Sequence, residues 1–244
     1  MYDTRPLSRR LLAEGLGSAL LAATVIGSGI MAEHMAGGNA AVALLANTGA
    51  TVAILYTLIT LLGPISGAHF NPVVSAVEAL RGRMRRRDAA AYTIGQILGC
   101  CAGAMLAHLM FELPLWQAAT HVRTGPAQWL AESVATFGLL LVVIGHRRAE
   151  EAPGMVACWI GAAYWFTSST SFANPAITIA RSLTNTFSGI RLTDAPGFIV
   201  AQLIGALVAL GVGRLLFTEA KPVAPSAETS TASIHDNPAK AIHV

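Results

Sequence analysis

Long stretches without a charged residue are the feature that most constrains how this chain can fold. Only 12% of its 244 residues are charged and 54% are hydrophobic, a composition that excludes an ordinary soluble domain. Several stretches approach or exceed the roughly 20 residues that a helix needs to cross a bilayer; they cover residues 15–32, 34–77, 89–111, 133–146, 152–180 and 195–213. Their polarity does not alternate as it does in the strands of a membrane barrel. The chain is therefore predicted to be an all-α membrane protein.

One Asn-Pro pair interrupts a charge-free stretch in each half of the chain, at Asn71-Pro72 and at Asn174-Pro175. Proline is tolerated at the first position of a helix, and the asparagine before it can cap that helix. Each pair therefore predicts the start of a short re-entrant half-helix, at 72–81 and 175–184. Six membrane spans are expected around these half-helices, near 11–32, 41–62, 90–111, 127–146, 154–170 and 196–217.

The two halves repeat one another. Leu-Ala-Glu occurs around Glu14 and again around Glu132, the Asn-Pro pairs correspond, and Gln-x-x-Gly begins at Gln96 and at Gln202. Each half contains three spans, an odd number, so the second half must enter the membrane from the opposite side. We expect two inverted pore repeats, at 11–111 and 127–217, joined by an extracellular loop at 112–126.

Five arginines between the first half-helix and the third span set the expected orientation; they are Arg81, Arg83, Arg85, Arg86 and Arg87. Between two membrane segments such a cluster indicates a cytoplasmic loop, and no nucleic acid partner is expected. Residues 1–10 are then cytoplasmic, as is the tail at 218–244, which is rich in Ala, Pro, Ser and Thr and is predicted to be disordered. The expected location is the bacterial inner (plasma) membrane.

The loops before the two Asn-Pro pairs predict a water-filled pathway. Irregular backbone is tolerated at membrane depth only when it is buried in protein or lines such a cavity. The loops at 66–70 and 168–173 can direct carbonyl groups into it, and Asn71 and Asn174 can offer N–H donors. The positive ends of both half-helix dipoles would point at the centre and oppose cations and protons. This arrangement favours a neutral, hydrogen-bonding solute.

The first of these loops resembles the signature of the aquaporin and aquaglyceroporin (major intrinsic protein) family; its sequence is Ser66-Gly67-Ala68-His69-Phe70-Asn71-Pro72. The resemblance covers roughly residues 10–217. It implies a homotetramer with one pore per subunit, and pore-lining loops that include Gly67, Ala68, His69, Phe172 and Ala173. His69 could instead be a packed loop histidine.

The resemblance also assigns a role to the two repeated glutamates. Glu14 and Glu132 match the membrane-buried glutamates of the family, which accept hydrogen bonds from the re-entrant loops. An ionised side chain at this depth is costly unless it is bonded. We therefore favour a loop-supporting role for both residues over a proton relay.

The chain departs from the family pattern where an arginine usually follows the second Asn-Pro-Ala. Ile177 stands there, and counting from the asparagines places the other filter positions at Thr51, Ala162 and Ser171. These residues are not bulky, aromatic or charged, which predicts a wide filter. Arg181 lies four residues after Ile177, on the same face of the half-helix. It either supplies part of the outer filter or braces the outer loops or a neighbouring subunit.

These features predict a passive channel for small neutral solutes. The sequence after Asn174 resembles a bacterial subgroup associated with arsenic resistance, which implies arsenous acid and glycerol-like polyols as solutes, with some water. A general water and glycerol facilitator is the alternative, and an ion-coupled secondary transporter is a remote one. An intramembrane enzyme is not expected, because no histidine is oriented to activate the serines near 168–171. No cofactor or metal ion is expected.

Overall fold

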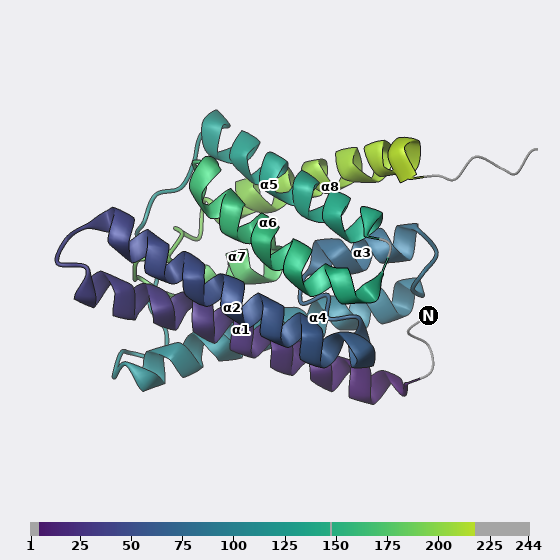
Figure 1. The fold of residues 1–244 in the computed structure, drawn as a ribbon. Helices are drawn as coiled ribbons and strands as arrows, with labels where there is room; N and C mark the ends of the chain where they lie inside the picture. Colours follow the sequence, from purple (N-terminus) through teal and green to yellow (C-terminus); the bar gives the residue numbers. More distant parts are fainter. Residues whose placement is uncertain (1–4, 147, 218–244) are drawn as a thin grey trace, which may run out of the picture.

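The computed structural model describes residues 5–146 and 148–217 (Figure 1). Within them the fold is entirely helical, which confirms the predicted class. The helices are α1 (Leu7–Met35), α2 (Ala40–Ser66), α3 (Pro72–Leu80), α4 (Arg86–Met110), α5 (Pro126–Gly145), the short 3-10 helix η1 (Ala149–Glu151), α6 (Ala152–Phe166), α7 (Pro175–Arg181) and α8 (Ala195–Phe217). The predicted tail at 218–244 lies outside the described residues.

Five helices are long and apolar enough to cross a membrane: α1, α2, α4, α5 and α8. The predicted fifth span, 154–170, is shorter than expected. Helix α6 has 15 residues and ends at Phe166, because Thr167 takes an extended conformation. Fifteen residues rise about 22 Å, against the roughly 30 Å of a bilayer core. Ser168, two residues after α6, nevertheless contacts Ala127 and Gln128 at the start of α5, so the chain reaches that end of the bundle before the loop returns to the centre.

The two short helices lie between two groups of long ones (Figure 1). In the first repeat α1 packs against α2 and α4, and in the second α5 packs against α6 and α8. Helices α2 and α6 join the repeats along one side. The half-helix α3 begins directly after Asn71 and α7 directly after Asn174, as the Asn-Pro pairs predict. Helix α7 ends at Arg181, three residues earlier than expected.

Equivalent glycines let the long helices of each repeat approach closely. A Cβ atom on Gly99 of α4 would lie 2.3 Å from the carbonyl oxygen of Gly15 on α1. A Cβ atom on Gly205 of α8 would lie 2.2 Å from the carbonyl oxygen of Ser133 on α5. Both glycines end the repeated Gln-x-x-Gly motif. Close backbone packing of this kind is typical of helices inside membranes.

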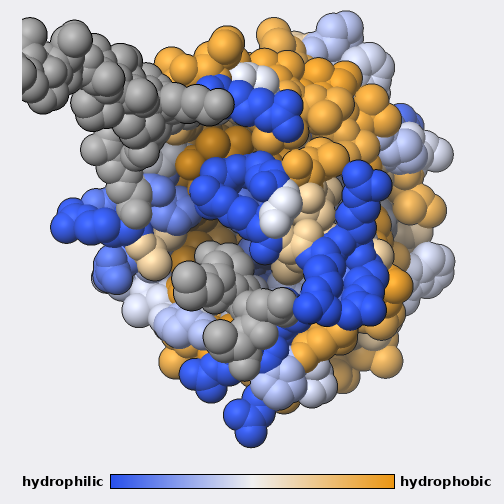
Figure 2. All heavy atoms as spheres, turned by 90° about the vertical axis from the view of Figure 1, so that its right-hand side faces the viewer, coloured by the Kyte–Doolittle hydropathy of each residue, from blue (hydrophilic) through white to orange (hydrophobic). Residues whose placement is uncertain are grey.

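The outer surface suits a bilayer. Large apolar side chains are exposed along the membrane-spanning helices, among them Leu12, Leu45, Leu98, Leu130 and Leu207. Figure 2 shows the right-hand end of Figure 1, where hydrophilic side chains surround the centre of the face and hydrophobic ones lie at its margin. This end carries the start of α1 and the arginine-rich turn between α3 and α4.

Candidate functional site

A cavity of about 640 Å³ runs between the two repeats. At the arginine-rich end Glu78, Arg83 and His146 line it, and at the other end Arg181 does. Most of the residues predicted to line a pore lie on its wall, including Thr51, Gly67, Ala68, His69, Asn71, Ser171, Phe172, Ala173, Asn174, Ile177 and Arg181. Residues more than 100 positions apart in the sequence thus share one cavity.

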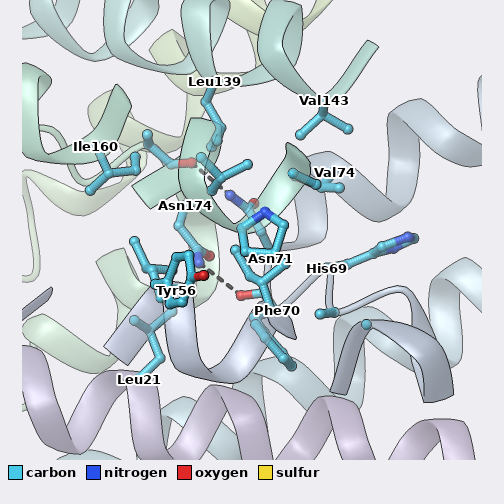
Figure 3. A pocket seen from close by; sticks show the side chains of 18 of the residues that line it. Leu21, Tyr56, His69, Phe70, Asn71, Val74, Leu139, Val143, Ile160 and Asn174 are labelled. Carbon is cyan, nitrogen blue, oxygen red and sulfur yellow. Dashed lines mark hydrogen bonds between the residues drawn. The ribbon is translucent and has the colours of Figure 1, made fainter. Parts of the chain in front are cut away.

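The two asparagines meet in the middle of this cavity (Figure 3). The amide nitrogen Nδ2 of Asn71 donates to the carbonyl of Ala173 at 2.8 Å, and Nδ2 of Asn174 donates to the carbonyl of Phe70 at 2.8 Å. We call these two bonds the crossed hydrogen bonds. They fasten the loop before each half-helix to the other half-helix.

Each asparagine also caps its own half-helix. The Oδ1 atom of Asn71 accepts a hydrogen bond from the backbone N–H of Val73, and Oδ1 of Asn174 accepts from the N–H of Ala176, both at 3.0 Å. An asparagine amide has two N–H donors, and the crossed bond uses one of them. The second N–H of each asparagine makes no hydrogen bond to another described residue.

Glu14 supports the first loop from behind. Its carboxylate accepts hydrogen bonds from Ser66 Oγ at 2.6 Å, from the backbone N–H groups of His69 and Phe70 at 3.0 and 2.7 Å, and from Gln96 Nε2 at 2.8 Å. The side chain is fully buried. Four donors compensate the cost of burying this carboxylate.

Glu132 supports the second loop in the same way. It accepts hydrogen bonds from Ser169 Oγ at 2.7 Å, from the backbone N–H groups of Phe172 and Ala173 at 2.8 and 2.9 Å, and from Gln202 Nε2 at 2.6 Å. The two carboxylates thus have matching sets of donors. This symmetry follows from the inverted repeat.

Two glutamines complete the repeated support, and sequence reasoning did not assign them a role. Gln96 also donates to Ser75 Oγ, and Gln202 also donates to Thr178 Oγ1, both at 3.0 Å. Each hydroxyl lies four residues after its pore asparagine. Each glutamine thus connects the buried glutamate to the half-helix of its repeat. The signal for this in the sequence was that both the Gln-x-x-Gly motif and these hydroxyls occur once in each half.

The backbone of both re-entrant loops is strained. Ala68, Phe70, Ser171 and Ala173 all have positive φ angles, between 47° and 52°. Such conformations cost about 1–3 kcal/mol each in residues other than glycine. The bonds from Glu14 and Glu132 to the backbone N–H groups of these loops offset that cost. Both loops thereby take the same shape.

His69 lies on the cavity wall, and its ring is also held from behind. Its Nδ1 atom is 3.0 Å from Ser75 Oγ, and its ring packs edge-on against Tyr92 at 5.5 Å between centroids. Both partners belong to the first repeat. The residue therefore combines the two roles that the sequence left open.

At the other end of the cavity, Arg181 covers the ring of Phe172. The centre of its guanidinium lies 3.4 Å from the ring centroid, a cation–π contact. Its Nε atom donates to the carbonyl of Ser188 in the loop that follows α7. Arg181 therefore lies on the cavity wall and also braces an outer loop.

The structure places Ala162, one of the predicted filter positions, away from the cavity wall. Ala162 is exposed on α6 and does not line the cavity, whereas Val156, Ile160 and Tyr164 do. These three residues follow the helical period, one turn apart. The hydroxyl oxygen of Tyr164 lies 3.2 Å from that of Thr51 on the neighbouring helix α2, and the two form a hydrogen bond.

The residues that line this end of the cavity differ from those that counting from the asparagines predicts. Thr51, Tyr164, Ser171 and Arg181 all line the cavity and are each only 3% exposed, so these residues are packed firmly into its wall. An aromatic ring and an arginine are therefore present there, contributed by residues that counting from the asparagines does not identify.

A second arginine, Arg123, holds the outer loops together. Its Nε atom donates to the carbonyl of Gly189 at 2.9 Å, and its guanidinium lies 5.3 Å from the centre of the Phe172 ring. Its backbone N–H donates to Asp194 at 3.0 Å. Although burial acts in the opposite direction, hydrogen bonds from Arg191 and from this N–H lower the pKa of Asp194 below its ordinary value.

The described residues contain no group of three or more His, Cys, Asp or Glu side chains that could hold a metal ion.

Comparison with known proteins agrees with this architecture. The chain is 56% identical over 228 residues to aquaglyceroporin AqpS of Rhizobium meliloti (strain 1021), a match that covers 93% of this chain and 97% of the relative. It is 29% identical over 187 residues to aquaporin Z of Photorhabdus laumondii, covering 67% of this chain and 78% of that protein.

Among solved structures, the fold matches that of the aquaglyceroporin from Plasmodium falciparum with a TM-score of 0.63 at 19% identity. The match covers 84% of this chain and 95% of the other. The family model for the major intrinsic proteins matches residues 1–170. The chain therefore belongs to the major intrinsic protein family, whose members are passive membrane channels and not enzymes.

Proposed function

We propose that this protein is a passive channel for small neutral solutes, with arsenous acid and glycerol-like polyols ahead of water. The observation that carries this proposal is the pair of asparagines in the middle of the cavity. After the crossed hydrogen bonds are made, each amide still has one N–H donor. Two donors from opposite repeats can replace part of the water shell of a hydroxylated solute as it passes.

The same arrangement should hinder the passage of ions through the cavity. Helices α3 and α7 begin at the two asparagines, so their N-terminal partial positive charges meet at the cavity centre. A cation that lost its water there would find no carboxylate, because both carboxylates of Glu14 and Glu132 are turned to the loops. These glutamates are bonded to four donors each, which also argues against a proton relay and against ion-coupled transport.

Arsenous acid fits this chemistry because it resembles glycerol, with three hydroxyl groups and no charge at neutral pH. Two features support it as a solute. Ile177 replaces the arginine of the family pattern, and the relative at 56% identity is named an aquaglyceroporin.

One observation favours the alternative, a water and glycerol facilitator without an arsenic role. Tyr164 and Arg181, which line the cavity, are bulkier than the residues counted from the asparagines and would leave less room for a solute. A tighter filter favours slimmer solutes.

We further propose a homotetramer in the bacterial inner membrane, with both termini in the cytoplasm. The arginine-rich face in Figure 2 supports this orientation, because basic residues favour the cytoplasmic side. At the opposite end Arg123 is buried, and Arg191 is paired with Asp194 at 2.8 Å. Because Arg123 is buried in protein and the charge of Arg191 is paired, these two arginines are a weak signal against this orientation.

Stopped-flow light scattering on proteoliposomes tests the solute assignment. Water, glycerol and arsenous acid are compared with empty liposomes of the same lipid. We expect glycerol and arsenous acid to cross well above the background rate. Passage of glycerol and water alone would establish the alternative, and uptake that depends on a proton or sodium gradient would overturn the channel mechanism.

The variant Arg181→Ala tests the outer filter in the same assay. We expect it to change the ratio of glycerol to water permeability, because it removes the guanidinium from the cavity wall. Unchanged permeation and solute selectivity, with normal assembly in detergent, would leave Arg181 with only its bracing role.

A further inference from the structure

We propose that Tyr164 determines solute specificity at the outer end of the cavity, by presenting its hydroxyl oxygen as a hydrogen-bond acceptor to passing polyols. The proposal rests on the proposed channel function and identifies a residue that acts within it. Tyr164 lies two residues beyond the position that counting from Asn174 predicts. Its role is therefore derived from the tertiary structure alone.

The direction of the hydrogen bonds around Tyr164 follows from Thr51. The Thr51 hydroxyl donates to the carbonyl of Asn47 at 2.8 Å. A carbonyl can only accept, and a threonine hydroxyl has a single proton. Thr51 must therefore accept in its 3.2 Å contact with Tyr164, and Tyr164 must donate.

Tyr164 is left with an acceptor and no donor. Its proton points to Thr51, so the remaining capacity of its oxygen is a lone pair. The residue lies on the cavity wall, and its ring is held on α6 with only 3% of its surface exposed. The orientation of this acceptor is thus fixed by the neighbouring helix.

Arg181, which also lines the cavity, supplies donors. Arg181 has five N–H groups and no acceptor, and only its Nε is bonded to protein within the described residues. The cavity wall at this end therefore combines an acceptor from α6 with guanidinium donors from α7.

A polyol can use the acceptor and the donors at once. Each hydroxyl of glycerol donates one hydrogen bond and accepts others, so it needs an acceptor as well as a donor when it loses its water shell. Arg181 cannot accept. Among the residues at this end, the oxygen of Tyr164 is the acceptor whose direction the structure fixes, and its loss should affect glycerol more than the smaller water molecule.

The experiment compares Tyr164→Phe with the wild-type protein in proteoliposomes, with glycerol and water permeabilities measured on the same vesicles. Phenylalanine keeps the ring and removes only the hydroxyl. We expect the ratio of glycerol to water permeability to fall about fivefold, the factor for one lost neutral hydrogen bond. An unchanged ratio, with thermal stability and oligomeric state preserved, would overturn the role of Tyr164.

Ala162→Ser is the matched control, because it adds a hydroxyl at the position that the family count identifies. Ala162 is exposed outside the cavity, so this variant should leave the ratio unchanged. A shift in Ala162→Ser with none in Tyr164→Phe would show that the counted position is the filter and would refute the inference.

The failure of this inference can be distinguished from failure of the proposed function. A wild-type protein that conducts no glycerol would overturn the channel assignment for polyols itself. A conducting wild type beside an unaltered Tyr164→Phe variant would overturn the role of Tyr164 alone.

Discussion

Asn71 and Asn174 each donate a hydrogen bond of 2.8 Å to the loop that carries the other, through the carbonyls of Ala173 and Phe70. Each residue also caps the half-helix that follows it. The pair is therefore a structural junction between the two repeats as well as the central feature of the pore. Mutations at either residue should affect stability and permeation together.

The variants Asn71→Ala and Asn174→Ala should each lower the free energy of unfolding by about 2 kcal/mol, half from the lost helix cap and half from the lost crossed bond. Denaturant titration in mixed micelles measures this loss. Because the crossed bonds share one junction, the double variant should lose less than the sum of the single variants. Strict additivity would show that the two bonds act independently.

Glu14→Gln and Glu132→Gln should destabilise the protein to a similar extent, by about 3 kcal/mol each, because an amide N–H₂ group would face donors that now meet a carboxylate oxygen. The same denaturant titration applies. Glu33→Gln is the control, since Glu33 is exposed near the end of α1. A marked difference between the two repeats would contradict the equivalence of their loops.

Two glycines of α8 should respond in opposite ways to alanine. Gly205→Ala would place its Cβ atom 2.2 Å from the carbonyl oxygen of Ser133, so α5 and α8 would have to separate. Gly211→Ala meets nothing within 4 Å and should be neutral or stabilising by up to about 1 kcal/mol, because alanine favours helices. Thermal melting in detergent distinguishes them; equal melting temperatures would refute the close packing.

The ion pair between Arg191 and Asp194 should stabilise the outer loops to unusually low pH. The pKa of Asp194 is lowered in the folded protein, so its contribution is fully present above the ordinary carboxyl pKa of about 3.9. It is lost only as the pH falls through the lower folded value.

Asp194→Asn provides the measurement for this ion pair. The gap in melting temperature between wild type and variant should remain constant from pH 7 to about pH 5 and should shrink only below the ordinary carboxyl range. A gap that closes near neutral pH would contradict the lowered pKa.

The class of the fold and the centre of the pore were predictable because they depend on local patterns. Charge-free stretches give membrane helices, and an Asn-Pro pair inside such a stretch favours the start of a helix. Glu14 and Glu132 stood out because an ionisable residue in an apolar stretch requires partners. The inverted order of the motifs then placed the two half-helices opposite one another.

The outer end of the cavity could not be predicted in this way. Counting along the chain assumes that the loop before Asn174 has a fixed shape, and the position of Ala162 depended on that assumption. In the structure α6 ends at Phe166, and its helical period turns Tyr164 toward the cavity and Ala162 away from it. A shift of two residues rotates a side chain by about 200° around a helix.

The sequence by itself thus predicted a membrane channel with two opposed half-helices and an asparagine at the tip of each, because charge-free stretches and repeated Asn-Pro motifs can be read along the chain. The tertiary structure alone decided that the asparagines form crossed hydrogen bonds and which side chains line the outer end. Tyr164, Thr51 and Arg181 come from three different helices, and their meeting depends on how α2, α6 and α7 pack, which no local pattern records.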